Sequence, residues 1–60
     1  MKTIKTKIGL ERHLQSVIGN ALKYYTDYPD TIFTINGHEI ARWNYDDDNY
    51  TILDKIYFED

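Results

Sequence analysis

The sequence contains no cysteine, one proline and three glycines. The lack of cysteine excludes disulfide bonds and thiolate metal sites. The two histidines could build a structural zinc site only together with carboxylates, which is an unusual ligand set. Gly9, Gly19 and Gly37 are too far apart to form a phosphate-binding loop. We therefore expect neither a metal ion nor a cofactor.

The chain also lacks a long apolar run. No stretch approaches the roughly 20 apolar residues that span a membrane. The basic N-terminal residues are not followed by the apolar segment of a signal peptide. We therefore expect a soluble, cytoplasmic protein. Its length suits a single small domain, residues 1–60, and small domains without disulfides or metals often gain stability by oligomerising, which leaves a homodimer open.

Charges of the two signs are separated along the chain. Residues 1–26 carry five basic residues and one acidic residue, whereas residues 27–60 carry nine acidic and two basic residues. Such a distribution governs the choice of partner and the association rate rather than the fold. The overall charge of −3 argues against direct binding of nucleic acid, because nucleic-acid binders usually present net positive charge to phosphates.

The N-terminal half predicts one helix. Residues 3–8 place Thr3, Lys5 and Lys7 on one face and Ile4, Thr6 and Ile8 on the other, which predicts a short strand or an ordered arm at residues 1–8. Residues 10–26 predict an amphipathic helix with Gly9 as its N-cap and Pro29 beyond its end. Gly19 falls on the outer face of this helix, either as a tolerated glycine or as a notch where another backbone approaches. The apolar stripe of the helix comprises Leu10, Leu14, Val17, Ile18, Ala21 and Tyr25.

The clearest local pattern is a β-hairpin at residues 31–45. Two β-rich runs flank Asn36-Gly37, the dipeptide that favours a type I′ turn. A two-residue loop leaves both faces of the hairpin partly apolar. The pairs expected from this loop are Ile35 with His38, Phe33 with Ile40, and Ile32 with Ala41.

The end of the chain completes the expected fold. Residues 46–49 predict a turn, and residues 50–58 predict a third strand. The fold is therefore expected to be α+β, with one amphipathic helix packed on a three-stranded antiparallel meander. Residues 1–8 are the candidate for an additional strand.

Two candidate sites, one for calcium binding and one for nucleophilic catalysis, lack residues that they would require. Counted from Asp46 or from Asp48, the acidic turn lacks the central glycine that a calcium-binding loop requires. His13 and Ser16 could meet on one helix face, but no orienting acid or oxyanion donors accompany them. We therefore expect that the protein is not an enzyme.

The acidic C-terminal half, which also holds most of the aromatic residues, is the better candidate for function. Tyr and Trp are enriched at interface hot spots, and carboxylates two residues apart on a strand are separated by roughly 6.6–6.8 Å, close to the phosphate spacing of a nucleic acid. We hypothesise that this surface mimics a nucleic acid and occludes the groove of a basic, nucleic-acid-handling protein. Small, acidic, cysteine-free chains of this kind are typical of phage-encoded inhibitors of host defence, such as anti-CRISPR proteins, which act in the host cytoplasm. The expected partner-binding residues are Trp43, Tyr45, Asp46, Asp47, Asp48, Tyr50, Asp54, Tyr57, Glu59 and Asp60.

Two alternatives use other residues. A structural or assembly subunit would self-associate through the second apolar face of the sheet, which a measurement of molecular mass would detect. A small DNA-binding regulator would contact phosphates through its basic arm and helix, and its binding would depend steeply on salt. The residues of that alternative are Lys2, Lys5, Lys7, Arg12 and Lys23.

Overall fold

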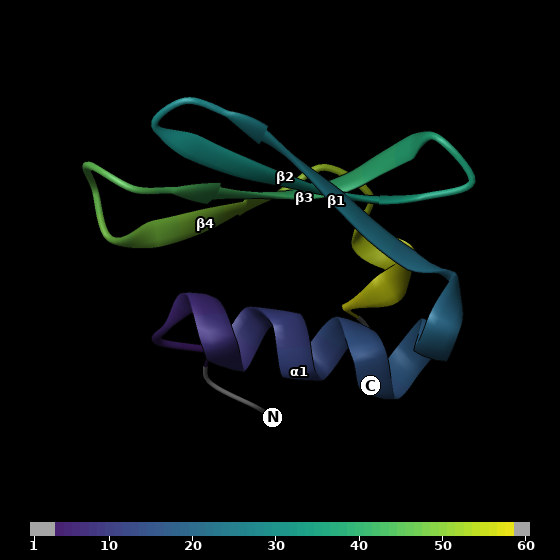
Figure 1. The fold of residues 1–60 in the computed structure, drawn as a ribbon. Helices are drawn as coiled ribbons and strands as arrows, with labels where there is room; N and C mark the ends of the chain where they lie inside the picture. The colour runs from purple at the N-terminus through teal and green to yellow at the C-terminus, as the bar shows by residue number, and fades with distance from the viewer. Residues whose placement is uncertain (1–3, 59–60) are drawn as a thin grey trace.

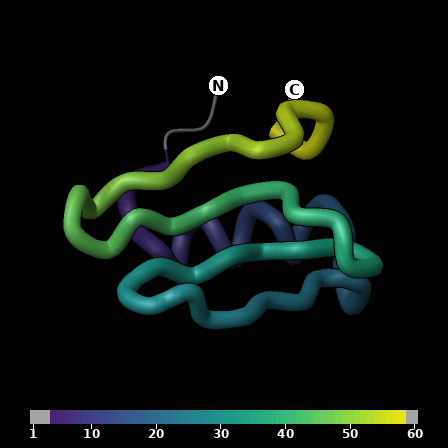
Figure 2. The backbone as a smooth tube through the Cα atoms, turned by 90° about the horizontal axis from the view of Figure 1, so that it is seen from above, coloured from purple at the N-terminus to yellow at the C-terminus, as the bar shows by residue number. Residues whose placement is uncertain are grey.

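A computed structural model of the chain describes residues 4–58, which form one helix beneath a four-stranded antiparallel sheet (Figure 1). The strands lie in the order β1-β2-β3-β4, so each strand pairs with its sequence neighbour (Figure 2). The predicted α+β class is confirmed. No helix within the described residues is long and apolar enough to cross a membrane. The elements are α1 (Lys7–Ile18), the 3₁₀ turn η1 (Gly19–Ala21), β1 (Leu22–Asp27), β2 (Asp30–Ile35), β3 (His38–Asn44), β4 (Asn49–Ile52) and the 3₁₀ turn η2 (Lys55–Tyr57).

The helix α1 starts earlier than the helix predicted at residues 10–26, and it also ends well before the predicted end. Its N-cap is Thr6 rather than Gly9, because the Thr6 hydroxyl accepts a hydrogen bond from the Gly9 backbone N–H at 2.9 Å. At the other end, Gly19 adopts a φ of +59°, which glycine tolerates and which terminates the helix. Gly19 is therefore a stop signal. It is neither a tolerated interior residue nor a packing notch, since nothing lies within 4 Å of the place of a Cβ.

The strand β1 occupies much of the segment predicted as helix. Tyr24, Tyr25 and Thr26 favour a strand once Gly19 has ended the helix. Tyr28 and Pro29 then form the turn into β2. The sequence pattern missed this strand because the helical spacing of apolar residues continues through Tyr25.

The predicted strand at residues 1–8 is absent where the structure describes the chain, whereas Ile4, which packs against the core, fits the alternative of an ordered arm. Ile4 and Lys5 belong to no strand, and Lys7 and Ile8 are already helical. The cause is the cap at Thr6, which starts α1 at the next residue. Residues 1–3 lie outside the described residues.

The predicted hairpin of β2 and β3 is present. Asn36 and Gly37 both adopt positive φ, as a type I′ turn requires. Ile35 lies opposite His38, as expected for a two-residue loop. Further from the turn, the register departs from the predicted one.

A β-bulge in β3 causes this departure. Phe33 lies opposite Ala41 instead of Ile40. The extra residue, Ile40, is buried together with Ala41, so two successive side chains belong to the core. The bulge also places Trp43 on the side of the sheet that faces α1, where it is only 5 % exposed.

The core lies between α1 and this side of the sheet. Leu10 and Leu14 of the predicted apolar stripe are completely buried, whereas Val17 is 49 % exposed. The two leucines pack against side chains of β2 and β3. Burying each such side chain stabilises the fold by about 1.5–3 kcal/mol. The buried sheet residues of this cluster are Phe33, Ile40, Ala41 and Trp43.

The opposite face of the sheet is polar, although the sequence predicted a second apolar face. Ile32 lies on this face. Its partner in β1 is Tyr25, and its partner in β3 is Arg42 instead of the predicted Ala41. These two long side chains flank it, and Ile32 is only 2 % exposed. The Tyr25 hydroxyl donates a hydrogen bond to the Glu39 carboxylate, which raises the pKa of Tyr25. The prediction failed because the bulge turns Ala41 and Trp43 toward the helix.

The strand β4 ends at Ile52, so the predicted third strand over residues 50–58 is too long. The Asp54 backbone N–H donates to the Ile40 carbonyl at 3.0 Å. The Asp54 carboxylate then caps η2 by accepting the Ile56 backbone N–H at 3.3 Å. This local hydrogen bond favours a turn over a continued strand.

His13 connects α1 to the C-terminal segment. Its Nε2 donates a hydrogen bond to the Tyr57 carbonyl at 2.9 Å. Its ring stacks on Phe58 with ring centroids 5.2 Å apart. These contacts give His13 a structural role that needs no partnership with Ser16.

Because Gly19 ends α1, the structure predicts how Gly19→Ala changes the stability of the fold. A Cβ meets no neighbour at this position, but an L-residue is strained at this positive φ. We expect the free energy of unfolding to fall by about 1–3 kcal/mol, measured by urea denaturation. The matched control is Ser16→Ala on the exposed face of α1, which should change stability by less than about 0.5 kcal/mol. Equal stabilities of Gly19→Ala and the wild type would contradict the assignment of Gly19 as the stop.

Candidate acidic and aromatic interface

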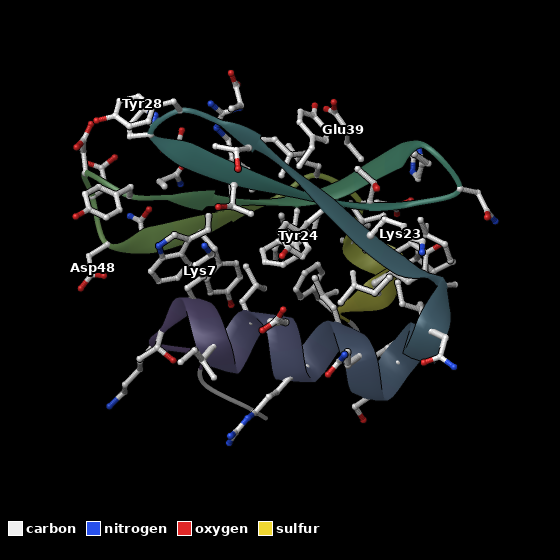
Figure 3. All side chains as sticks on the ribbon, in the orientation of Figure 1. Lys7, Lys23, Tyr24, Tyr28, Glu39 and Asp48 are labelled. Atoms are coloured by element: carbon white, nitrogen blue, oxygen red, sulfur yellow. The ribbon has the colours of Figure 1, made fainter. Side chains whose placement is uncertain are left out.

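Two turns lie at the same end of the sheet. The β1–β2 turn at Tyr28 and Pro29 and the β3–β4 turn at residues 45–48 both lie opposite the Asn36-Gly37 turn, because consecutive strands are antiparallel. Figure 3 shows Tyr28 and Asp48 together at this end. We call this region the acidic end, and it comprises Asp27, Tyr28, Pro29, Asp30, Tyr45, Asp46, Asp47 and Asp48.

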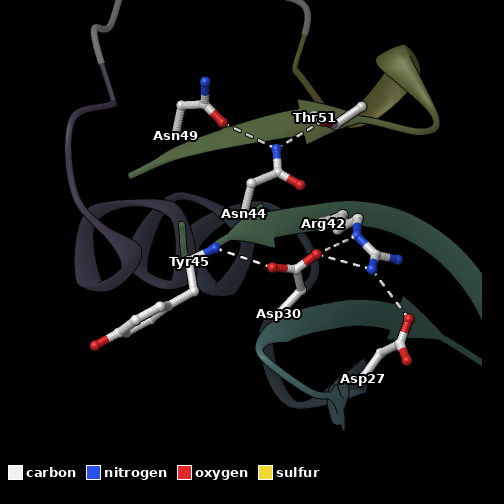
Figure 4. Close-up of polar contacts among 7 residues, drawn as sticks. All are labelled: Asp27, Asp30, Arg42, Asn44, Tyr45, Asn49 and Thr51. Atoms are coloured by element: carbon white, nitrogen blue, oxygen red, sulfur yellow. Dashed lines mark hydrogen bonds and ion pairs between the residues drawn. The ribbon is translucent and has the colours of Figure 1, made fainter. Parts of the chain in front are cut away.

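Asp30 joins the two turns. One of its carboxylate oxygens accepts a hydrogen bond from the Tyr45 backbone N–H at 3.0 Å. The other accepts a hydrogen bond from Nε of Arg42 at 2.8 Å and forms an ion pair with Nη2 of Arg42, also at 2.8 Å (Figure 4). Nη2 of Arg42 also donates to Asp27 at 3.0 Å. The Asp30 carboxylate thus fixes the β3–β4 turn relative to β2, and Arg42 extends these contacts to Asp27 of β1.

The same contacts change the ionisation of Asp30. The hydrogen bond from the Tyr45 backbone N–H, followed by the contact with Arg42, lowers the pKa of the Asp30 carboxyl below its usual range, although partial burial opposes this effect. The charged form is therefore the one that the fold stabilises.

Next to these contacts, Tyr28, Pro29 and Tyr45 line a pocket of about 270 Å³. Tyr28 is 91 % exposed and Tyr45 is 67 % exposed. Aromatic side chains with so much free surface have no packing role in the core, and Tyr and Trp are preferred contact residues in protein interfaces. The pocket is thus an aromatic surface that is available to a partner.

Residues 46–48 directly follow Tyr45, which lines this pocket. All three side chains are exposed. The turn is closed by a hydrogen bond from the Asp48 backbone N–H to the Tyr45 carbonyl at 3.3 Å, and Asp48 adopts a φ of +53°, which aspartate tolerates better than most residues. The acidic end contains five carboxylates, and Arg42 pairs with only two of them. Its local field is strongly negative.

Three aromatic residues of the predicted site belong to the core instead. Trp43 is buried under the sheet. Tyr50 and Tyr57 are half-buried and pack against the same core, and the Tyr50 ring lies 6.1 Å from the ring of Phe58. Trp43 in particular does not provide the exposed anchor that the sequence suggested.

The remaining predicted acidic residues do not join the acidic end. Asp54 lies near the Asn36-Gly37 end of the sheet, where its Oδ2 contacts Nε2 of His38 at 2.8 Å. This contact, followed by the Ile56 backbone N–H, lowers the pKa of Asp54. Glu59 and Asp60 lie outside the described residues.

The predicted site lacks four members of the acidic end, namely Asp27, Tyr28, Pro29 and Asp30. Asp27, Tyr28 and Asp30 stand between the predicted helix and the predicted hairpin, so no pattern joined them to residues 45–48. The Tyr-Pro-Asp sequence is a turn signal between strands, and it would have located them if β1 had been recognised.

The basic residues of the DNA-binding alternative do not share one face. Lys23 lies on the face of the sheet that is turned away from α1, because the neighbouring Tyr24 lies opposite the core residue Phe33. Lys7 of α1 lines a pocket between the helix and the sheet (Figure 3). Arg12 is exposed on α1. Lys5 precedes α1, and Lys2 lies outside the described residues.

Neither metal ligation nor similarity identifies the site. Within residues 4–58, no group of three or more His, Asp or Glu side chains is arranged to hold a metal ion. No family model, curated protein or solved structure matches the chain. The function must therefore be inferred from the acidic end itself.

The lowered pKa of Asp30 predicts a pH dependence for the variant Asp30→Asn. Because the pKa is lower in the folded state, Asp30 stabilises the fold above the pKa of the unfolded chain, and this contribution disappears as the pH falls through the folded-state pKa. The wild type should therefore be more stable than Asp30→Asn at pH 7, and the difference should shrink below about pH 4.

Thermal unfolding followed by circular dichroism between pH 2 and pH 7 measures this difference. Asp47→Asn is the matched control, because Asp47 is an exposed aspartate of the same end. It should change the unfolding temperature little. A difference between Asp30→Asn and the wild type that is constant over the whole range would contradict the assigned role.

Proposed function

We propose that the chain is a small, non-enzymatic binding protein that inserts its acidic end into the basic groove of a nucleic-acid-handling protein and so blocks that groove. The observation that carries this proposal is the aromatic pocket of Tyr28, Pro29 and Tyr45 beside three exposed aspartates. The partner is a protein with exposed arginine and lysine side chains, not a nucleic acid.

The chemistry of the pocket suits an arginine side chain. A guanidinium stacks on aromatic faces and forms paired hydrogen bonds with carboxylates. Tyr28 and Tyr45 offer the aromatic faces, and residues 46–48 offer the carboxylates. A cation–π contact of this kind contributes about 0.5–2 kcal/mol, and several such contacts are needed for a stable complex.

Charge supports the same partner. The exposed carboxylates of the acidic end attract a positive groove and repel nucleic acid, and complementary fields of this kind accelerate association. The proteins that carry such grooves are those that bind phosphate backbones. Blocking a groove requires no catalytic residue. His13, a candidate catalytic residue, instead forms a hydrogen bond to the Tyr57 carbonyl.

A cytoplasmic defence nuclease of a bacterial host has a groove of the required kind. Inhibition of such an enzyme, in the manner of a phage-encoded anti-CRISPR protein, is the most specific form of the proposal. It rests on similarity of size, charge and cysteine content.

Affinity capture tests the proposal. The wild-type protein is immobilised and incubated with a bacterial lysate, and captured proteins are identified by mass spectrometry. We expect basic, nucleic-acid-binding proteins that are displaced by added DNA, since both ligands compete for one groove. Replacing Asp46, Asp47 and Asp48 together by Asn should lower recovery at least about tenfold, which corresponds to about 1.4 kcal/mol.

The control removes acidic charge elsewhere, through Glu11→Gln combined with Glu39→Gln, and should retain recovery. Unchanged recovery with the triple variant would contradict the proposal. So would direct binding of the wild type to DNA with a steep salt dependence in a gel-shift experiment.

A further inference from the structure

The strand β1 forms one edge of the sheet. It pairs with β2 on one side only, and no other described segment lies along its second side (Figure 2). All of its residues after Leu22 are exposed. Its outward backbone N–H and C=O groups are therefore free to pair with another strand.

This edge has little protection against such pairing. Natural edge strands are usually short, bulged, interrupted by proline or lined with charged side chains, and β1 has only the last of these, in Lys23 and Asp27 of opposite sign. β1 has six residues in an unbroken register with β2 and contains neither a bulge nor a proline. β4, at the other edge, has four residues.

The order of side chains along β1 is complementary to itself. If two copies of β1 pair in antiparallel orientation around Tyr25, Lys23 of each copy lies opposite Asp27 of the other. Opposite charges in directly paired positions contribute roughly 0.2–1 kcal/mol, and the two-fold symmetry forms the pair twice. The two Tyr25 side chains then lie opposite one another on the same face.

The side chains of β1 that face α1 are compatible with the same register. Tyr24 is 62 % exposed there, and it lines a pocket of about 270 Å³ together with Phe33 and Thr31. Figure 3 shows Tyr24 in the layer between the sheet and α1. In the register around Tyr25, Tyr24 of the second copy lies opposite Thr26, whose own partner in β2 is Thr31. Each Tyr24 ring is thereby brought next to the pocket of the other copy.

We infer that two copies of the chain associate through β1 and form one continuous antiparallel sheet. The interface is isologous, because the same strand is used by both copies. Both helices lie on the same side of the joined sheet, and the two acidic ends point in opposite directions because the β1 strands are antiparallel. The dimer therefore leaves residues 46–48 free, and it does not depend on the proposed function.

Molecular mass in solution is the first test. Sedimentation equilibrium between 1 µM and 1 mM should show a monomer–dimer equilibrium for the wild type. Lys23→Glu places like charges opposite Asp27 and should raise the dissociation constant at least tenfold. Lys5→Glu makes the same charge change outside β1 and should leave the equilibrium unchanged. A wild type that is monomeric at 1 mM would overturn the inference.

Disulfide trapping tests the register, and the absence of native cysteine makes it unambiguous. Tyr25→Cys places two thiols at the two-fold axis, where directly opposed residues are close enough for a disulfide. We expect Tyr25→Cys to oxidise to a covalent dimer, whereas Thr51→Cys in β4 should remain largely monomeric. Circular dichroism verifies that both variants fold. A covalent dimer formed by Thr51→Cys but not by Tyr25→Cys would overturn the inference.

Discussion

The carboxylate of Asp30 is the contact on which the acidic end depends. The turn at residues 45–48 is held relative to β2 by the hydrogen bond from the Tyr45 backbone N–H to Asp30. Arg42 adds two bonds to the same carboxylate and one to Asp27. Without these contacts, Tyr45 and Tyr28 would not be held on either side of a common pocket. Asp30 thus links the stability of the sheet end to the shape of the proposed interface.

The remaining carboxylates of this end have a different role. Arg42 pairs with both Asp27 and Asp30 and offsets one of their two negative charges, so these two carboxylates mainly hold the structure together. Residues 46–48 are exposed, and they dominate the outward field. This division explains how a small sheet tolerates five carboxylates in one place, since like charges in fixed proximity destabilise a fold unless they are paired or solvated.

Local sequence signals predicted part of this structure. The Asn36-Gly37 turn and the buried Leu10 and Leu14 depend on neighbouring residues only, and the structure confirms them. The end of α1 could not be placed from the spacing of apolar residues, because that spacing continues beyond Gly19. The bulge at Ile40 places both Ile40 and Ala41 in the core, and no residue type in the hairpin marks it. Its effect was large, since it exchanged the two faces of β3.

The candidate site, too, could be predicted only where local sequence signals determine the structure. The turn that carries residues 46–48 was predicted because turn chemistry is local, whereas Trp43 was misplaced because an aromatic residue in a strand fits a core or a surface equally well. Tyr28 and Asp30 are far from them in sequence and become neighbours only when β1 exists.

The most direct measurement is a nuclear magnetic resonance titration of the protein with a short arginine-rich peptide. If the two turns form one surface, amide shifts should change together at Tyr28 and at residues 45–48, and the ring signals of Tyr28 and Tyr45 should move with them. Shift changes confined to α1 or to the region of Asp54, with Tyr28 and Tyr45 unaffected, would contradict the central claim that the acidic end is the binding surface.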